Sequence, residues 1–222
     1  MELVQQEWDE VLKCYVDAPL LPVFRAHRWP TNGHMIADVA RLGYIKDNDW
    51  VLDPTYGYGT WWTQWQPCMV TKADKYVQRG TDVYPVDFTG HNPPHLTWED
   101  ATFDVVAYDP PFKLNGTPSE PDARYGVDEP ATIAERHLLM SEGLSECVRV
   151  CKPGGIVLMK CMDQVSSGKV QWQTRVFADE GERLGCTLID RLDFLMTPRP
   201  QRSQVHAHAN YSTLLVFRKA RR

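Results

Sequence analysis

The chain has 222 residues, of which 43% are apolar and 24% are charged, and its net charge is −5. This length and composition are typical of one globular domain with a substantial core. No apolar run approaches the roughly 18 residues of a membrane-spanning helix, so we expect no membrane partner. The first 20 residues mix charged and apolar side chains and do not resemble a signal peptide, which favours the cytoplasm.

The charge is unevenly distributed along the chain. Residues 197–222 contain six Arg and Lys side chains and no acidic one, so all 29 Asp and Glu residues precede this segment. An asymmetry of this kind hints at contact with a polyanion near the C-terminus. For Arg221 and Arg222 themselves we expect a solvated tail.

The cysteines and histidines do not predict a metal site. The six cysteines form no Cys-x-x-Cys pair, and His206 and His208 lie in a polar segment without a third ligand nearby. Cys147, Cys151 and Cys161 lie among apolar residues, and we expect them to be small core residues.

The N-terminal part of the chain is expected to be helical. Residues 2–18 are predicted to form a short amphipathic helix within an extension over residues 1–24. Residues 30–45 predict a second helix, which Thr31 or Asn32 can cap and Gly43 can end.

Seven apolar, β-rich segments then predict the strands of one sheet. They cover residues 50–54, 68–74, 84–88, 103–111, 156–163, 186–195 and 212–219. Residues 132–150 and 174–185 have helical periodicity, and Lys-Pro-Gly-Gly at 152–155 predicts a turn. This alternation indicates a single α/β domain with a mostly parallel seven-stranded sheet and helices on both faces. About 16 residues without a helical pattern join the last two strands, so we expect one antiparallel strand.

The first strand leads into a loop, Asp-Pro-Thr-Tyr-Gly-Tyr-Gly-Thr, at residues 53–60. Gly57 and Gly59 allow the backbone to approach a ligand closely, and we expect the loop to open onto a helix. Two glycines fall short of the dinucleotide fingerprint G-x-G-x-x-G. The lack of Gly-Lys-Ser/Thr also argues against a phosphate-binding P-loop.

Acidic residues end the next two predicted strands. Asp74 lies about 20 residues after Asp53, where a carboxylate is placed to accept both ribose hydroxyls of a nucleoside. Asp87 ends the third segment and could accept from an exocyclic adenine amine. The ordered set, each acid at the end of a strand, indicates a nucleoside-binding site.

The clearest strand ends in Asp109-Pro110-Pro111-Phe112. Prolines lack the N–H and fix their own φ, so they stop the ladder and hold a rigid turn. Asp109 and Phe112 are then presented at the carboxyl end of the strand, where open α/β sheets place their active sites.

On these motifs the chain resembles the S-adenosylmethionine-dependent methyltransferases with the Rossmann-like class I fold. More narrowly, it is similar to the amino-methylating DNA methyltransferases, which modify adenine N6 or cytosine N4. The resemblance covers about residues 25–219. Within the family the chain looks most like small phage or actinobacterial stand-alone enzymes. That likeness lies in residues 124–126, 152–155, 160–169 and 212–219.

The resemblance implies a role for each motif. A loop of this kind holds the cofactor S-adenosylmethionine, with an acid like Asp74 on its ribose and one like Asp87 on its adenine. The implied cofactor-binding residues are Asp53, Pro54, Thr55, Gly57, Gly59, Thr60, Asp74 and Asp87. The tetrapeptide Asp109, Pro110, Pro111 and Phe112 is the implied catalytic motif. The helix over residues 30–45 would cover the methionine end of the cofactor.

The implied chemistry suits a rigid acceptor. An exocyclic amine is a poor nucleophile because its lone pair is delocalised into the ring. Asp109 and the Pro110 carbonyl can accept its two N–H groups and favour a more pyramidal nitrogen. Phe112 would stack on the base, which must leave the DNA duplex. An Asp in the first position favours adenine N6, with cytosine N4 as the alternative. Cytosine C5 methylation would need a cysteine nucleophile beside the catalytic strand. Cys68 lies at the second predicted strand, far from that position along the chain.

Two polar segments, 113–130 and 197–211, are expected to flank the site and contact duplex DNA. Their Arg, Lys, Gln and Tyr side chains can hold phosphates and read base edges. The candidates are Lys113, Arg124, Tyr125, Arg199, Arg202 and Gln204. No separate recognition domain is visible, so specificity must come from these loops or from a second copy of the chain in a homodimer, or be short and relaxed.

Three other functions stay open at the level of sequence. Methylation of an exocyclic amine in RNA would use the same tetrapeptide. A catalytically inactive nucleic-acid-binding module could keep the fold, although the intact Asp109 and Phe112 argue against it. A nucleotide oxidoreductase could share the fold class, but the incomplete glycine fingerprint counts against it.

Overall fold

The computed structural model describes residues 4–9, 14–19, 29–75, 82–87, 96–114, 132–166, 168–195 and 211–221. Within this part of the chain the main sheet has seven strands in the order β10-β11-β7-β6-β3-β4-β5. The strands are β3 (Trp50–Asp53), β4 (Met69–Asp74), β5 (Val83–Pro85), β6 (Phe103–Tyr108), β7 (Cys151–Cys161), β10 (Cys186–Leu195) and β11 (Tyr211–Lys219).

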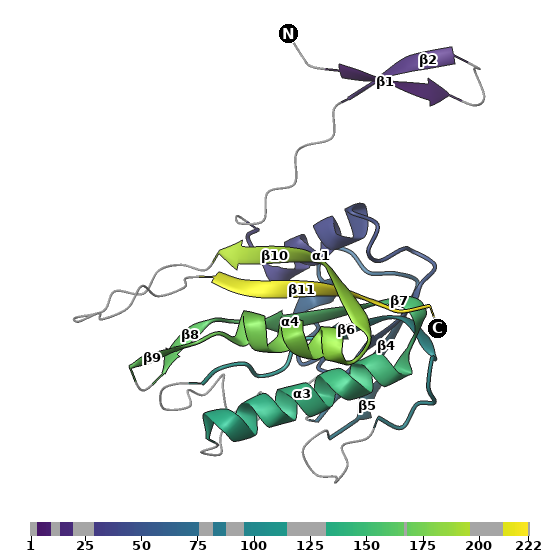
Figure 1. Cartoon of the computed structure of the whole chain (residues 1–222). Helices are drawn as coiled ribbons and strands as arrows, with labels where there is room; N and C mark the ends of the chain where they lie inside the picture. Colours follow the sequence, from purple (N-terminus) through teal and green to yellow (C-terminus); the bar gives the residue numbers. More distant parts are fainter. Residues whose placement is uncertain are drawn as a thin grey trace.

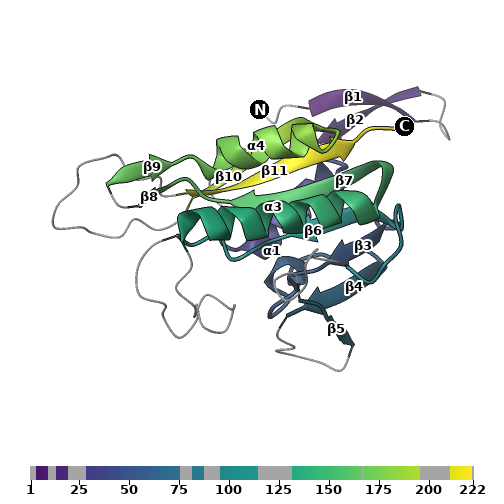
Figure 2. The same ribbon diagram turned by 60° about the horizontal axis from the view of Figure 1, so that its bottom comes forward.

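All neighbours in this sheet are parallel except at β11, which is antiparallel to both β10 and β7. The predicted seven-stranded sheet with one antiparallel strand is therefore confirmed. Two further strands, β8 (Gln164–Ser166) and β9 (Lys169–Gln171), form a small hairpin that extends from the carboxyl end of β7 (Figure 2).

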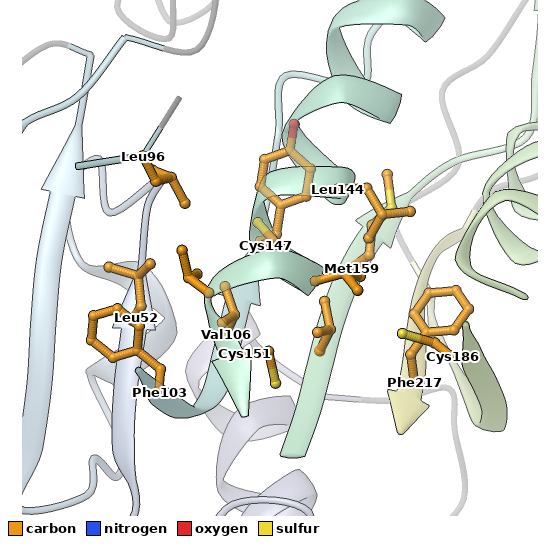
Figure 3. Packing of buried hydrophobic residues seen from close by; sticks show 14 of the residues in the cluster. Leu52, Leu96, Phe103, Val106, Leu144, Cys147, Cys151, Met159, Cys186 and Phe217 are labelled. Atoms are coloured by element: carbon orange, nitrogen blue, oxygen red, sulfur yellow. The ribbon is translucent and has the colours of Figure 1, made fainter. Parts of the chain in front are cut away.

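Helices cover both faces of the sheet, as predicted. Figure 1 shows α3 (Ile133–Val150) and α4 (Gln173–Arg183) on one face and α1 (Asn32–Arg41) on the other. Each face has its own buried cluster. In Figure 3, Leu144 and Cys147 of α3 face Val106 and Met159 of the sheet. Burial of these two apolar layers is the main favourable contribution to folding.

Local sequence accounts for most helix ends. Thr132 caps α3 through a reciprocal capping box with Glu135. Gly43 follows α1 with a φ of 82° and Gly185 follows α4 with a φ of 84°, and both values favour glycine. At the other end of α3, Lys219 Nζ donates to the carbonyls of Val148 and Cys151, each at 2.7 Å.

The structure corrects the prediction of a helix over residues 2–18. These residues contain β1 (Val4–Asp9) and β2 (Cys14–Pro19), which pair antiparallel. The sequence Tyr15-Val16 favours an extended backbone. Cross-strand pairing also satisfies the backbone hydrogen-bonding groups of both strands, whereas an isolated helix of this length would be only marginally stable.

Two further expectations need correction. The glycine loop opens onto a single 3-10 turn, η1 (Thr60–Trp62), because few residues remain before Pro67 and the start of β4. The turn predicted at residues 152–155 lies inside β7, where pairing with β6 jumps from Cys151 to Ile156. Gly154, with a φ of 80°, allows this bulge.

The predicted core cysteines Cys147, Cys151 and Cys161 are fully buried. In the part of the chain that is described, none of the helices combines the length and the apolar character needed to cross a bilayer.

Candidate active site

The glycine loop and the proline motif meet where the strand order reverses. From β3 the chain moves outward to β4 and β5, and then returns to β6 on the other side of β3. The carboxyl ends of β3 and β6 therefore diverge to their loops at a topological switch point, the usual ligand position in an open α/β sheet. A hydrogen bond joins the two loops there, since Asp109 N donates to Thr55 Oγ1 at 2.8 Å.

The glycine loop is held against β4 by backbone and side-chain contacts. Gly57 N donates to Asp74 Oδ2 at 2.6 Å, and Tyr56 N donates to the Ala73 carbonyl at 2.9 Å. Gly57 and Gly59 have φ values of 51° and 69°, in the left-handed region. A Cβ at Gly59 would also lie 2.5 Å from the Tyr56 hydroxyl. Both positions thus require glycine for conformation, and Gly59 also for space.

Asp53 lies beneath this loop rather than at its surface. The residue is 3% exposed, and its carboxylate accepts from Trp62 Nε1 at 2.8 Å and from Thr55 N at 3.1 Å. Burial raises the pKa of Asp53 to about 7, and the charges of Asp109 and Asp74 act in the same direction. The observed role of Asp53 is to shape the loop, and its direct contact with a cofactor stays a prediction.

Asp109 is oriented from two sides. Its Oδ2 accepts from Trp61 Nε1 at 2.8 Å and lies 3.7 Å from Lys160 Nζ. Trp61 belongs to η1 and Lys160 to β7, so the carboxylate is held between the elements on either side of it. Among the described residues none hydrogen-bonds to Asp109 Oδ1.

The peptide after the two prolines is fixed by two glutamines. The Phe112 carbonyl accepts from Gln164 Nε2 at 2.7 Å and from Gln173 Nε2 at 3.0 Å. Gln173 is fully buried at the start of α4, and its Oε1 accepts from Met162 N. Pro110 is buried and Pro111 is exposed. The proline turn is thus locked at both ends, because Thr55 holds it before Pro110 and the glutamines hold it after Pro111.

The structure brings most of the predicted cofactor and catalytic residues together. Hydrogen bonds connect the loop residues Asp53, Thr55 and Gly57 with Asp74 and Asp109. Pro54 is buried within the same loop, and Thr60 begins η1.

Other predicted residues lie further out or beyond what is described. Asp87 follows β5, two strands from β3, and pairs with Lys75 at 3.8 Å. Lys113 is half-buried just after the proline motif. The remaining predicted DNA contacts lie outside the described residues, namely Arg124, Tyr125, Arg199, Arg202 and Gln204, as do His206 and His208.

Several residues of this site were missed at the sequence level. The sequence did not predict that the indoles of Trp61 and Trp62 donate hydrogen bonds to carboxylates. Lys160 interrupts the apolar run Ile-Val-Leu-Met-Lys-Cys-Met, and a charge in a buried strand was the available signal. Gln164 and Gln173 carry no comparable signal. Across the described ranges, no three His, Cys, Asp or Glu side chains are grouped as metal ligands would be.

A scan of protein-family models finds none that matches this chain, and a search of curated proteins finds no relative. Solved structures do align with it. TrmN from Thermus thermophilus aligns with a TM-score of 0.50 at 16% identity, over 84% of this chain and 48% of that one.

Two other structures align less closely. A methyltransferase candidate of Haloferax volcanii, in complex with the Trm112 methyltransferase activator, gives a TM-score of 0.49 at 13% identity, over 85% of this chain and 94% of that one. A candidate DNA modification methylase from Thermus thermophilus, complexed with S-adenosyl-L-methionine, gives 0.40 at 13% identity, over 56% and 48%. This chain thus spans about half the length of the latter protein.

The likeness to TrmN bears on the fold alone. The strand order, the single antiparallel strand and the alignment with TrmN together give the chain the Rossmann-like fold of class I methyltransferases. The prediction of this fold is confirmed.

Proposed function

We propose that this protein transfers a methyl group from S-adenosylmethionine to an exocyclic amine of a nucleobase, with adenine N6 in DNA as the target. The observation that carries the proposal is the placement of Asp109. Its carboxylate is fixed at the carboxyl end of β6, joined by Thr55 to a glycine loop that follows β3, at the switch point of a methyltransferase fold.

The residues of this edge fit S-adenosylmethionine. The loop at Gly57 and Gly59 has left-handed backbone that brings main-chain atoms close to a ligand without side chains. Asp74 ends β4 beside this loop and would accept from the ribose hydroxyls. Asp87 follows β5, one strand further out, and would accept from the adenine amine. When bound, the cofactor supplies an electrophilic methyl group on a sulfonium sulfur.

The chain's own contribution is to prepare the amine. Asp109 Oδ1 and the Pro110 carbonyl each accept a hydrogen bond from one N–H of the target amine. This geometry directs the nitrogen lone pair away from the two acceptors. The cofactor would supply its methyl group to this nitrogen and would leave as a neutral thioether. The amine nitrogen then loses one proton, for which Asp109 is the adjacent acceptor.

Phe112 is the residue proposed to stack on the target base. Its ring packs partly against the core cluster while its carbonyl is fixed by two glutamines. A rigid aromatic beside the acceptor suits a base that has been rotated out of a duplex. Asp in the first position of the tetrapeptide favours adenine over cytosine, and the polar segments on either side are the proposed DNA contacts.

The test compares substrates and variants in one assay. We would incubate the protein with S-adenosylmethionine and unmethylated duplex DNA, or RNA of the same sequence, and quantify methylated nucleosides by mass spectrometry. N6-methyladenine from DNA is the expected product. N4-methylcytosine would change the base and keep the mechanism, and methylated RNA alone would replace DNA as substrate.

The variants separate the two proposed roles. Asp74→Ala is expected to weaken cofactor binding first, whereas Asp109→Ala is expected to keep it and lose turnover. Binding of S-adenosylmethionine, measured by calorimetry, that ranks the two variants the other way would contradict these roles.

A further inference from the structure

Lys160 is a buried cation inside the proposed active site. The residue is 6% exposed and lies on β7, in register with Leu214 of β11, at the carboxyl end of an apolar strand. Burying an ammonium group is unfavourable unless it is paired or hydrogen-bonded. A leucine or methionine would fill the same strand position without the free-energy cost of desolvating a charge. The contacts of the ammonium group therefore indicate what the charge does.

The side chain of Lys160 contacts several residues of the proposed active site. Lys160 Nζ donates to Asn32 Oδ1 at 2.9 Å, at the start of α1, and lies 3.7 Å from Asp109 Oδ2. The ammonium also faces the rings of Phe112 and Phe194 at 5.7 and 5.8 Å from their centroids. These distances are within the range of cation–π attraction. One side chain thus contacts the acceptor carboxylate, the stacking aromatic and the helix over the site.

The surroundings of Asp109 explain why a cation is useful there. Asp53 and Asp74 are carboxylates of the same site, and the charges of Asp109 and Asp74 both raise the pKa of Asp53. A cation beside these carboxylates offsets their mutual repulsion. The target amine donates, so Asp109 must offer it an acceptor oxygen that is held in a fixed direction.

We propose that Lys160 is a positioning residue whose ammonium, together with the Trp61 indole, fixes Asp109 Oδ2 so that Oδ1 faces the target amine. This inference rests on the proposed methyl transfer. Because Lys160 contacts Asn32 and the two phenylalanine rings, it also keeps the acceptor and the stacking ring in register with α1.

The first experiment separates turnover from cofactor binding. In Lys160→Met, kcat at saturating cofactor and DNA should fall roughly 100-fold, the scale of losing one preorganised group. The dissociation constant for S-adenosylmethionine should change less than about threefold, and Lys160→Arg should recover part of kcat. Lys152→Met is the matched control, since Lys152 lies on the same strand and pairs with Asp104 at 2.7 Å. If Lys160→Met keeps kcat within about threefold of the unmutated protein, the proposal is wrong.

A rescue experiment separates charge from packing. Lys160→Ala should regain turnover when propylammonium is added, whereas 1-propanol, which has a similar volume without the charge, should give none. Equal rescue by both compounds would overturn the proposal in favour of simple packing. Should Lys160→Met fail to fold, Lys160→Gln keeps a donor toward Asn32 without the charge and serves the same comparison.

A third readout does not depend on activity. The indole N–H of Trp61 reports on Asp109, and its resonance can be assigned with Trp61→Phe in protein labelled with ¹⁵N-tryptophan. This resonance should move in Lys160→Met and stay in place in Lys152→Met. An unmoved resonance contradicts the proposal even if the unmutated protein methylates no substrate. A moved resonance in an inactive protein supports the positioning of Asp109 while removing the proposed function.

Discussion

Trp61 donates its indole N–H to Asp109 Oδ2 at 2.8 Å, across 48 residues of sequence. This bond joins the turn after the glycine loop to the carboxylate that begins the proline motif. The proposed cofactor loop and the proposed acceptor are therefore parts of one hydrogen-bonded unit. A substitution in either part should alter the position of the other.

Trp61→Phe tests this unit directly. The substitution keeps a buried ring but removes the donor to Asp109, so kcat should fall by roughly 10-fold to 100-fold. Cofactor affinity should change less, because Gly57 is still held by Asp74. Trp65→Phe is the control, since Trp65 is a half-buried member of the same cluster. Equal losses of kcat in both variants would show that the indole bond is not needed.

Asp53 gives the folded protein a characteristic dependence on pH. Its pKa is about 7 when folded, against an ordinary value of 3.8 for a solvated Asp, so the folded state binds the additional proton between these values. The free energy of unfolding should therefore fall as pH rises from about 4 to about 7, by at most roughly 4 kcal/mol from this group.

Asp53→Asn isolates that effect. The amide cannot ionise, so the stability of the variant relative to the unmutated protein should improve between pH 5 and pH 8. The free energy of unfolding of the variant should also be lower by about 1 kcal/mol at every pH. The reason is that the amide cannot accept both of the hydrogen bonds that the Asp53 carboxylate accepts. Urea unfolding at the two pH values measures the difference, and an unchanged difference would contradict the assigned pKa.

Gly59→Ala should weaken cofactor binding, with Gly43→Ala as its matched control. Both glycines have positive φ, 69° at Gly59 and 82° at Gly43, so each substitution should cost at least about 1 kcal/mol in the free energy of unfolding. Only at Gly59 does the new methyl group meet Tyr56, whereas Gly43 faces open space. Calorimetry should show at least a tenfold loss of S-adenosylmethionine affinity for Gly59→Ala alone. Equal affinities would place the cofactor away from this loop.

Gln164 and Gln173 should act as a pair. Each donates to the Phe112 carbonyl, so either Gln→Ala substitution leaves one donor in place. The double variant should lose more turnover than the product of the two single losses. Methyl-transfer rates of the four proteins give this coupling. Strictly multiplicative losses would mean that the Phe112 peptide is fixed by other contacts.

Lys219 tests how the basic C-terminal segment is used. Its ammonium caps the carbonyl end of α3 through Val148 and Cys151. Lys219→Met should lower the free energy of unfolding by about 1–3 kcal/mol and leave the affinity for DNA unchanged. A loss of DNA affinity without a loss of stability would return Lys219 to the proposed polyanion contact.

The features that sequence predicts well here are local ones. Gly57 and Gly59 indicate a turn, Pro110 and Pro111 end a strand, and apolar periodicity marks the helices. Strand ends in a parallel sheet meet at one edge, so Asp53, Asp74 and Asp109 could be expected together from their positions alone.

The features that sequence misses depend on distant contacts. Whether an indole N–H meets a carboxylate, as for Trp61 and Trp62, is decided by how η1 packs, and a tryptophan looks the same in sequence when it merely fills the core. Lys160 was visible as a charge in an apolar run, but its partners lie on α1, on β10 and after β6. The strands at Val4–Asp9 and Cys14–Pro19 were missed because pairing overrode a weak helical pattern.

The most direct test of the central claim is methyl transfer with a labelled cofactor. S-adenosylmethionine carrying a deuterated methyl group would be incubated with unmethylated duplex DNA and with the unmutated protein, Asp109→Ala, or the control Asp104→Ala on β6, the strand that Asp109 follows. Mass spectrometry of the digested DNA should find deuterated N6-methyladenine from the unmutated protein and from Asp104→Ala, and none from Asp109→Ala. Equal label in all three would contradict the role of Asp109. No label on any base, with cofactor bound, would contradict DNA methylation itself.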